Sequence, residues 1–310
     1  MSAFTIDHRL DESVTVTADG TALFTYTYRP DTVQLESPKP YLHPLRTLGG
    51  DVVSLFRPHD HVWHKGIAWA LPHVGEHNFW GGPTYVQKPE DAPGQGSYVQ
   101  LENNGRAASS ALTELVADKD SARIAHRLDW TTQQGDLVIQ EQRRISAGIA
   151  GDGEAWVLTF ETAMTNVSGA AISFGSPTTK GRENAGYGGL FWRGPRSFTG
   201  GVIHTPGASG GEELRGIREE WMGFSGQHDE SARWSTVVMV DARENPLHPP
   251  QWFARNEQFA CLCPAPFFSE EFGLPAEQTL SLRYAVVIAD GMDSREDVTR
   301  LASWGREALS

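Results

Sequence analysis

Cysteine is scarce in this 310-residue chain, which has only two, Cys261 and Cys263. One residue separates them, a spacing that suits neither a relaxed disulfide nor a complete zinc site. A scaffold held together by disulfides is therefore excluded. The pattern predicts two buried or half-buried thiols on a single strand, where cysteine behaves as a small apolar residue.

Long apolar runs and an excess of positive charge are missing too. No stretch approaches the roughly 18–20 apolar residues that span a bilayer, and the first residues lack the basic start and apolar block of a signal peptide. The formal net charge is −13, whereas nucleic acids and anionic membranes are bound by basic surfaces. We therefore expect a cytoplasmic protein whose partners include neither nucleic acid nor membrane. Whether it forms a homo-oligomer is left open.

The familiar catalytic signatures are absent as well. The chain has no nucleophile elbow, phosphate-binding loop, dinucleotide fingerprint or HExxH sequence. No motif therefore calls for a cofactor. Catalytic groups have to be sought in the local clustering of polar side chains instead.

What the chain does contain is strand-like alternation of apolar and polar residues. Residues 14–17 and 22–28 flank Ala18-Asp19-Gly20, a pattern typical of a β-hairpin with a glycine-assisted turn. With glycine and proline frequent between them, the strand-like segments predict an all-β fold, a large antiparallel β-sandwich that forms one domain over residues 1–310. The later stretches with the same period of two are 122–130, 137–145, 156–165, 235–240 and 280–288.

One segment near the C-terminus follows a helical pattern instead. Apolar residues at 298, 301 and 302 recur near helical spacing, and Ser294 with Asp297 approximates a capping box. This pattern predicts a short C-terminal helix, residues 292–309, packed against the edge of the sandwich. The composition of residues 88–96 predicts an exposed loop, or alternatively a lid over a site.

Histidine is concentrated in one part of the chain. Six of the eleven histidines lie between residues 43 and 77, and His59, His61 and His64 are close neighbours there. Imidazole titrates near neutral pH and binds metals, so this density indicates a functional use. His59 and His61 are two apart, which on a strand puts both on one face, and a turn at Gly66 could bring His64 alongside.

A metal site is one hypothesis for these histidines, because His-x-His is a spacing that metal ligands use. The cation at Lys65 would oppose the binding of a dication, however. The first carboxylate after it is Glu76, so the cupin pattern is not met. We therefore expect no metal cofactor, and keep a divalent ion on His59, His61 and His64 as the alternative.

A second cluster, at residues 181–193, combines aromatic rings with arginine, asparagine and glutamate in a glycine-rich frame. Related groups recur at 251–255 and 267–271. Aromatic faces stack on the C–H faces of sugar rings, planar polar groups bind the hydroxyls, and a histidine–glutamate pair can act as general acid and base. The clustering favours a sugar site, and the alternative is that the ten tryptophans fill a broad β core.

Several of these motifs together resemble a bacterial family often labelled methane oxygenase PmoA-like. Its members carry a motif close to Asp-His-Pro-His-His-Arg-Gly-Leu-Trp, which residues 60–69 resemble, with His43-Pro44-Leu45-Arg46 upstream. A Phe-Trp pair is matched by Phe79-Trp80, and a Gly-Tyr-Gly-Gly-Leu-Phe-Trp-Arg-like segment by residues 186–193. The resemblance covers roughly residues 20–291. The chain departs from it where Val62, Trp63 and Lys65 stand for Pro, His and Arg.

The resemblance implies a galactose mutarotase-like supersandwich, a fold whose members commonly bind or transform carbohydrates. The family label names a membrane-embedded enzyme, whereas this chain has no apolar run of transmembrane length. What the resemblance implies is therefore sugar chemistry, and not methane oxidation.

Our first hypothesis is an enzyme that acts by acid–base chemistry on a sugar, an oxidised sugar or a glycoside, as an epimerase or mutarotase, a lyase or a hydrolase. In this hypothesis His61 and His64 are acids or electrophiles, and Glu183 is the base with Glu270 in reserve. The alternatives are a non-catalytic carbohydrate-binding or sensor protein, and a metal-dependent oxygenase or hydrolase centred on the histidines. The residues expected to bind the carbohydrate are His43, Arg46, Lys65, Trp80, Tyr187, Trp192, Arg193 and Arg255.

Overall fold

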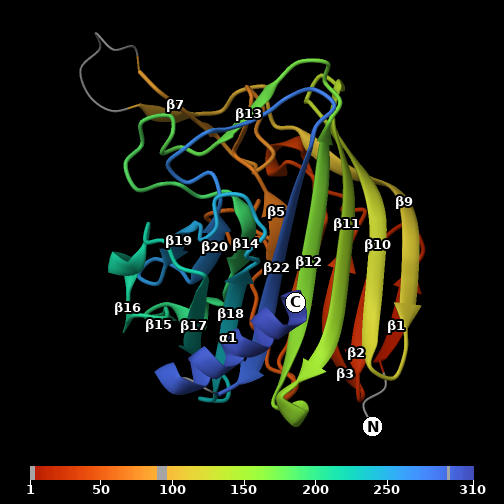
Figure 1. Ribbon diagram of the computed structural model, residues 1–310, viewed down its shortest axis with the longest axis vertical. Coiled ribbons are helices and arrows are strands. Elements are labelled where there is room, and N and C mark those ends of the chain that lie inside the picture. Colours follow the sequence, from red (N-terminus) through yellow and green to blue (C-terminus); the bar gives the residue numbers. More distant parts are fainter. Residues whose placement is uncertain (1–3, 89–95, 292–293) are drawn as a thin grey trace.

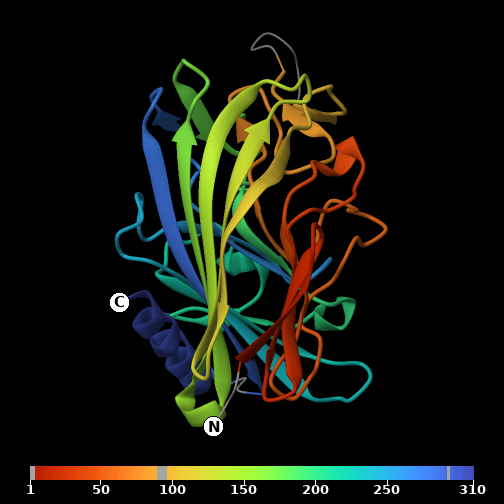
Figure 2. The same cartoon turned by 90° about the vertical axis from the view of Figure 1, so that its right-hand side faces the viewer.

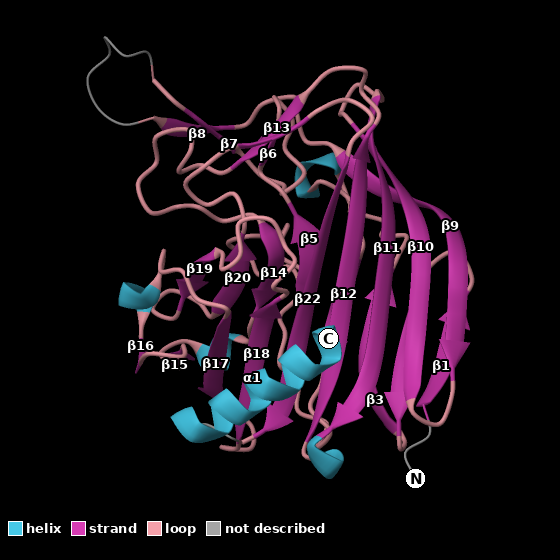
Figure 3. Ribbon diagram, in the orientation of Figure 1, coloured by secondary structure: helices cyan, strands magenta, loops and turns pink. Residues whose placement is uncertain are grey.

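Two antiparallel β-sheets packed face to face dominate the computed structural model, which describes residues 4–88, 96–291 and 294–310. Figure 1 shows the long strands of one sheet side by side, and Figure 2, turned by 90°, shows the other sheet as a separate layer. A single α-helix is present within the described ranges (Figure 3). The predicted fold class, a large antiparallel β-sandwich with a short C-terminal helix, is confirmed. Residues 89–95 of the predicted loop or lid lie outside the described residues.

The first sheet has eight strands in the hydrogen-bonded order β1-β2-β3-β4-β5-β14-β20-β19. The predicted hairpin is present as β2 and β3, which pair antiparallel with Val14 opposite Tyr26. The strands are β1 (Phe4–Arg9), β2 (Ser13–Ala18), β3 (Thr21–Thr27), β4 (Tyr41–Leu45), β5 (Ile67–Ala70), β14 (Gly189–Arg193), β19 (Gln251–Arg255) and β20 (Cys261–Ala265).

The second sheet has nine strands in the order β16-β15-β17-β18-β22-β12-β11-β10-β9. All five later stretches with a period of two lie in its strands β10, β11, β12, β18 and β22. The strands are β9 (Arg106–Ala117), β10 (Ser121–Thr131), β11 (Leu137–Ala150), β12 (Ala155–Asn166), β15 (Val202–His204), β16 (Ser209–Gly210), β17 (Trp221–Gln227), β18 (Trp234–Asp241) and β22 (Thr279–Asp290).

Two small sheets lie beyond one end of the sandwich, near β7 and β13 at the top of Figure 1. One has the order β21-β13-β6 and the other pairs β7 with β8. Their strands are β6 (His73–Val74), β7 (Thr84–Val86), β8 (Ser97–Val99), β13 (Ile172–Gly175) and β21 (Phe272–Leu274). Short 3-10 helices span Gln34–Glu36, Gly151–Gly153, Arg196–Phe198 and Glu212–Leu214.

The main hydrophobic core lies between the two large sheets and is rich in aromatic rings. Trp69 on β5 packs against Phe160 on β12 and Tyr284 on β22, with ring centroids 6.1 and 5.9 Å apart. Burying one aromatic side chain removes about 150–250 Å² from water, so such rings dominate the energetics of a core. Several tryptophans are thus core residues, which was the alternative to a sugar-binding role. Trp156 and Trp252 are examples, and both are fully buried.

Strand alternation decides which side chains of the first sheet enter this core. Leu190 and Trp192 on β14 belong to the core between the sheets, whereas Phe191 belongs to a separate buried cluster on the opposite face. Successive side chains of a strand point to opposite faces. On β20, Cys261 and Cys263 face the same way as Phe191, and both are free, buried thiols on one strand, as predicted. The outer face of β5, β14, β19 and β20 is therefore available for a site.

The helix α1 (Arg295–Leu309) covers the outer face of the second sheet, as Figure 2 shows. Val298, Leu301 and Ala302 pack with Val287 and other small apolar residues of β12, β18 and β22. The predicted cap is present, because the Ser294 hydroxyl accepts a hydrogen bond from the backbone N–H of Asp297. Positions 292 and 293 of the predicted helix lie outside the described residues. No helix in the described part of the chain is long and apolar enough to span a membrane.

A buried ion pair lies within the core. Glu141 accepts hydrogen bonds from Arg143 at both of its oxygens, at 2.7 and 2.9 Å, and the Trp130 indole also donates to it at 2.8 Å. Arg143 in turn donates to the hydroxyl of Tyr26 on the facing sheet, at 3.1 Å. Both charged side chains are almost fully buried, at 1% exposure. The pair therefore joins the two sheets, and both oxygens of Glu141 and all three nitrogens of Arg143 have a hydrogen-bond partner.

Removing one partner of this pair leaves the other as an uncompensated buried charge. We expect Glu141→Ala to lower the free energy of unfolding by about 3–5 kcal/mol, measured by urea denaturation. A matched control is Glu114→Ala, which breaks an exposed pair with Arg123 and should cost less than about 1 kcal/mol. Equal losses in the two variants would contradict the structural role given to the buried pair.

Candidate functional site

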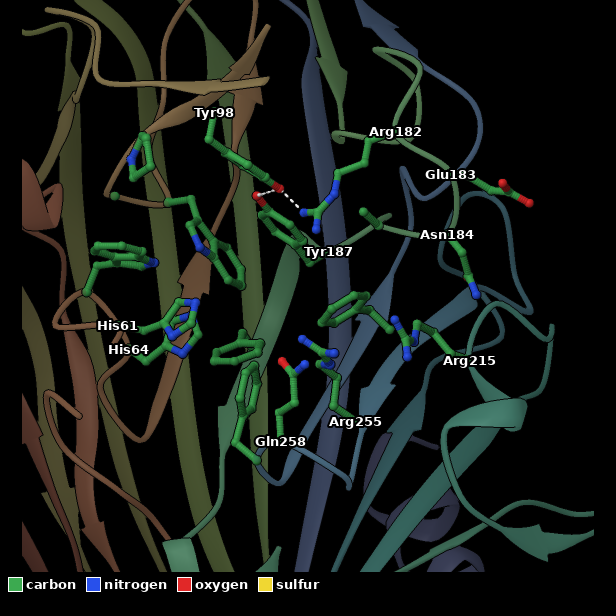
Figure 4. A pocket seen from close by; sticks show the side chains of 18 residues that line it. His61, His64, Tyr98, Arg182, Glu183, Asn184, Tyr187, Arg215, Arg255 and Gln258 are labelled. Atoms are coloured by element: carbon green, nitrogen blue, oxygen red, sulfur yellow. Dashed lines mark hydrogen bonds between the residues drawn. The ribbon is translucent and has the colours of Figure 1, made fainter. Parts of the chain in front are cut away.

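A pocket of about 500 Å³ opens on the outer face of the first sheet. Its lining comes from segments far apart in sequence: the turn before β5, the loop after β6, strand β8, strand β14 with the loop before it, the end of the 3-10 helix at Glu212–Leu214, and the β19–β20 region. Figure 4 shows the lining side chains converging from these elements. The lining residues are His61, Trp63, His64, Trp80, Gly81, Pro83, Tyr98, Arg182, Glu183, Asn184, Ala185, Tyr187, Phe191, Arg215, Phe253, Arg255, Gln258 and Phe259.

A tight turn just before β5 brings two of the clustered histidines together. The backbone N–H of His64 donates to the carbonyl of His61 at 2.9 Å. Gly66 has φ +58°, and a Cβ there would lie 2.0 Å from the carbonyl oxygen of Leu42. Only glycine fits this left-handed, crowded position. The turn that brings His64 alongside His61 is formed by residues 61–64. Gly66, which was predicted to supply it, follows this turn and lets the chain pass close to Leu42.

His61 is held by the carboxylate that precedes it. Its Nδ1 lies 2.9 Å from Oδ2 of Asp60. Burial raises the pKa of Asp60, but hydrogen bonds from His61 and the charge of Arg193 lower it overall, so this carboxyl is ionised and can only accept. The ring proton of neutral His61 is therefore on Nδ1. Its Nε2 keeps a free lone pair and can act as a base.

His64 is held in the opposite way, by a buried arginine. Nη1 of Arg193 lies 3.0 Å from Nδ1 of His64, and Nη2 of the same guanidinium lies 3.7 Å from Oδ2 of Asp60. A guanidinium can only donate hydrogen bonds, so Nδ1 of His64 must be unprotonated. The proton of this ring is therefore on Nε2. His64 presents an N–H donor where His61 presents an acceptor.

The two imidazoles lie face to face. Their ring centroids are 4.7 Å apart and the planes are inclined by 14°. Burial lowers the pKa of His64 well below its usual value of 6.5, and the nearby His61 and Arg193 lower it further. Burial also lowers the pKa of His61, although Asp60 opposes this shift. At neutral pH the pocket thus contains two uncharged, stacked rings with opposite hydrogen-bonding character.

Aromatic rings form the other apolar surfaces of the pocket. Trp80 packs edge-on against His64, with ring centroids 5.5 Å apart, and its ring is tilted against that of Tyr187, with centroids 4.7 Å apart. Trp63 lines the pocket as well, and its indole Nε1 is buried with no hydrogen-bond partner among the described residues. Gly82, with φ +67°, makes room for this ring, because a Cβ there would lie 2.6 Å from it. The pocket is thus lined by aromatic rings on several sides.

Six of the predicted site residues line the pocket: His61, His64, Glu183, Trp80, Tyr187 and Arg255. Glu183 is not near the histidines, however. Figure 4 shows it across the pocket from His61 and His64, with its carboxylate turned away from them. The carboxylate that the fold brings to a histidine is that of Asp60. The predicted histidine–glutamate pair is therefore not formed in this structure.

The other predicted residues do not line the pocket. Trp192 is on the core face of β14, where its indole donates to the carbonyl of Val53 at 2.8 Å. Lys65 is buried in an ion pair with Glu36 at 2.8 Å. His43 stacks on a phenylalanine outside the pocket, and burial lowers its pKa to about 4. The pocket lining also lacks Arg46, Arg193 and the reserve base Glu270. Arg193 contacts His64 from outside the pocket, at Nδ1. Glu270 is exposed and pairs with Arg218.

The three-histidine metal site is not formed. His59 is exposed in the turn, whereas His61 and His64 are stacked in the pocket. No group of three or more His, Cys, Asp or Glu side chains in the described ranges is arranged to hold a metal ion. Stacking turns the ring edges of His61 and His64 side by side instead of toward a common point, which is the physical reason for this outcome.

Sequence reasoning missed several residues of the site. Asp60 directly precedes His61 in the sequence, and this position is the signal that could have identified it as the partner of that histidine. Arg182 and Asn184 lie inside the cluster at residues 181–193, but its glycine-rich sequence does not indicate which of its side chains enter the pocket. Arg215 and Tyr98 come from other parts of the chain and had no local signal at all. Only the folded chain brings these last two to the pocket.

One family model matches most of the chain. It covers residues 13–303 and describes a family of unknown function, DUF6807. The label PmoA-like, suggested by the motifs, is not part of that description and stays a prediction. No curated protein sequence matches this chain.

Several solved structures are similar to this chain at low sequence identity. A galactose mutarotase-like protein from Clostridium acetobutylicum is 12% identical, with 93% of this chain and 98% of that chain covered and a TM-score of 0.38. An α-galactosidase from Lactobacillus brevis is 10% identical, with 96% and 40% covered and a TM-score of 0.41. One from Geobacillus stearothermophilus is 11% identical, with 97% and 41% covered and a TM-score of 0.39. The chain thus spans about two fifths of either α-galactosidase, and scores of this size carry no argument about function.

The contact between Arg193 and His64 leads to a prediction about protonation. In Arg193→Met, the positive charge and the donor on Nδ1 are both lost, so we expect the pKa of His64 to rise toward its usual value. Ring ¹⁵N chemical shifts measured by NMR across pH 4–8 would show this rise, and they also report which nitrogen carries the proton. Arg182→Met is a matched control, because it removes a pocket arginine that does not contact His64. An unchanged pKa in Arg193→Met would contradict the account of how His64 is kept neutral.

Proposed function

This chain is a member of the DUF6807 family of unknown function, and we propose that it is an enzyme that transforms a sugar or an oxidised sugar by proton transfer. The observation that carries the proposal is the pair of stacked histidines, in which His61 offers a lone pair on Nε2 and His64 offers an N–H on Nε2. A base beside a hydrogen-bond donor is the arrangement needed to move a proton while an adjacent oxygen gains charge.

In the proposed step, Nε2 of His61 takes a proton from a hydroxyl of the sugar, or from a C–H next to its carbonyl. If the proton comes from a C–H next to the carbonyl, the electrons of the C–H bond form a C=C bond and the carbonyl oxygen gains negative charge. If it comes from the anomeric hydroxyl, the electrons of the O–H bond form a C=O bond, the ring C–O bond breaks, and the ring oxygen gains the charge. Nε2–H of His64 donates a hydrogen bond to that oxygen. Because Asp60 is ionised and bonded to Nδ1 of His61, it stabilises the imidazolium that forms.

The assignment of roles differs from the one predicted from the sequence. His64 cannot serve as a strong acid, because its pKa is lowered by burial and a neutral imidazole gives up its remaining proton very reluctantly. It acts as an electrophile that polarises an oxygen. His61 takes the place of Glu183 as the base. We propose that Glu183, on the opposite side of the pocket, binds a hydroxyl of the substrate instead.

The surroundings of the pair suit a sugar ring. Trp63 and Trp80 present flat faces, which pack well against the C–H faces of a pyranose. Asn184 and Gln258 line the pocket with amide groups that can both donate and accept hydrogen bonds. The return of the proton from His61 to a different atom or face would give an isomerisation or epimerisation, and loss of a neighbouring substituent would give a lyase reaction. These outcomes share the same first step.

Removal of the base tests this proposal directly. After a screen of glycosides, 3-keto-glycosides and sugar acids has identified a substrate, we expect His61→Ala to lower kcat by about 10²–10⁴-fold while substrate binding is retained. The matched control is His59→Ala, which changes an exposed histidine of the same turn and should leave kcat unchanged. If ligand binds and no turnover is found with any member of the screen, the protein is a carbohydrate-binding or sensor protein. If Glu183→Gln abolishes turnover and His61→Ala does not, the base is misassigned.

The pH dependence has a sign that follows from the same contacts. As pH falls, His61 of the free enzyme takes up a proton and can no longer act as a base, so kcat/KM falls. Because burial lowers the pKa of His61 below 6.5, this fall comes below pH 6.5. Asp60 raises that pKa, so Asp60→Asn should shift the fall to still lower pH while it also lowers kcat. A shift to higher pH in Asp60→Asn would contradict the proposed pairing.

A further inference from the structure

Positive charge gathers in the pocket of a chain whose formal net charge is −13. Arg182, Arg215 and Arg255 all line it, and Glu183 is the one acidic residue among the lining residues that the structure describes. The two histidines are uncharged near neutral pH. A neutral sugar would not require three guanidinium groups at its site. The surplus of positive charge needs an explanation of its own.

Two of these arginines are held by one carboxylate. Glu212, in the 3-10 helix before Arg215, is hydrogen-bonded to Arg215 through Oε2 and to Arg255 through Oε1, the latter at 3.3 Å. Glu212 does not line the pocket itself. One negative charge behind two positive charges leaves a net charge of about +1 on this group of three side chains. The carboxylate thus fixes both guanidinium groups without neutralising them.

The positions of these guanidinium groups are fixed further by aromatic rings. Arg255 lies over the ring of Phe259 at 5.2 Å and Arg215 over the ring of Phe253 at 5.6 Å. The Nε of Arg215 is buried and has no hydrogen-bond partner among the described residues. The contacts with these rings thus hold the guanidinium groups of Arg215 and Arg255 in the wall of the pocket.

We propose that Arg215 and Arg255 bind a carboxylate of the substrate, so that the enzyme acts on a sugar acid. The inference rests on the proposed function, because it assumes that the substrate is a sugar. It adds the chemical group of that sugar, a carboxylate, that the two arginines bind. Figure 4 shows Arg255 between the histidine pair and Arg215, so a carboxylate bound there leaves the sugar ring to extend toward His61. A planar guanidinium matches a carboxylate with two parallel hydrogen bonds.

A carboxylate fits this charge better than a phosphate does. The arginine pair and Glu212 together leave about one positive charge, which one carboxylate neutralises. A phosphate monoester carries about −1.5 to −2 at neutral pH and would leave negative charge in a partly buried pocket. The third arginine, Arg182, is bonded to the hydroxyl of Tyr98 and lies over that ring at 4.8 Å. These contacts hold Arg182 on another wall of the pocket, and its guanidinium keeps its charge there.

The test is a comparison of matched ligands by isothermal titration calorimetry. The probes are D-galacturonate and D-glucuronate, the corresponding neutral sugars D-galactose and D-glucose, and the corresponding 6-phosphates. We expect at least one acid to bind about tenfold or more tightly than its neutral counterpart and than its phosphate, since a hydrogen bond to a charged group contributes that much. In Arg255→Gln and Arg215→Gln this preference should fall to about threefold or less. Arg218→Gln, a change at an exposed arginine outside the pocket, should keep it.

Each outcome decides the matter. The inference is overturned if no acid binds more tightly than its neutral counterpart, if a phosphate binds best, or if the preference survives in both pocket variants. His61→Ala separates this result from the proposed function, because it should lower kcat strongly and keep the preference for acids. A preference for acids in a protein without turnover would support the carboxylate site and count against the enzyme. Turnover of neutral sugars with no preference for acids would do the opposite.

Discussion

The site depends on one buried guanidinium, that of Arg193. It donates to Nδ1 of His64 and lies beside Asp60, which in turn holds His61, so a single side chain sets the orientation of both rings. A buried charge is costly unless it is paired and hydrogen-bonded, and here Asp60 and His64, in the turn before β5, supply the partners. The backbone reinforces the arrangement, because Arg193 N–H donates to the carbonyl of Gly66 at 2.8 Å. The end of β14 and the histidine turn are thus joined twice, once through the backbone and once through side chains.

A second set of charged residues holds the turn between Arg57 and Lys65 in place. Glu36 is buried and pairs with Lys65 at 2.8 Å and with Arg57 at 2.7 Å, so both ends of the turn are tied to one carboxylate. Burial would raise the pKa of Glu36, but the hydrogen bonds from these cations hold it below its usual value. Lys39 donates to the carbonyl of Trp80 at 2.7 Å and fixes the backbone where that ring enters the pocket. Lys65, which the sequence suggested as a carbohydrate-binding residue, is therefore part of the ion pairs that hold the turn and does not line the pocket.

Much of the fold follows from the sequence, because a period of two is a local property. This period indicates the hairpin and the long strands of the second sheet. The same alternation decides which side chains of β14 face the pocket and which face the core. There Phe191 and Arg193 alternate with Trp192, so the position of Trp192 in the core could have been derived from the strand alone. The hydrogen bond between Arg255 and Glu212 could not have been derived in this way. It joins residues that are 43 apart in the chain, and it depends on the packing of irregular segments. The same holds for the separation of Glu183 from the histidines, since glycine-rich loops give no local indication of where they place a side chain.

The most direct test of the central claim is a crystal structure of the protein with the tightest-binding sugar acid of the panel. The account predicts one substrate oxygen about 3 Å from Nε2 of His64, a proton-bearing atom of the substrate at a similar distance from Nε2 of His61, and the carboxylate on Arg215 and Arg255. A ligand bound outside this pocket, or one whose reactive atoms face Glu183 and leave both Nε2 atoms without contact, would contradict it.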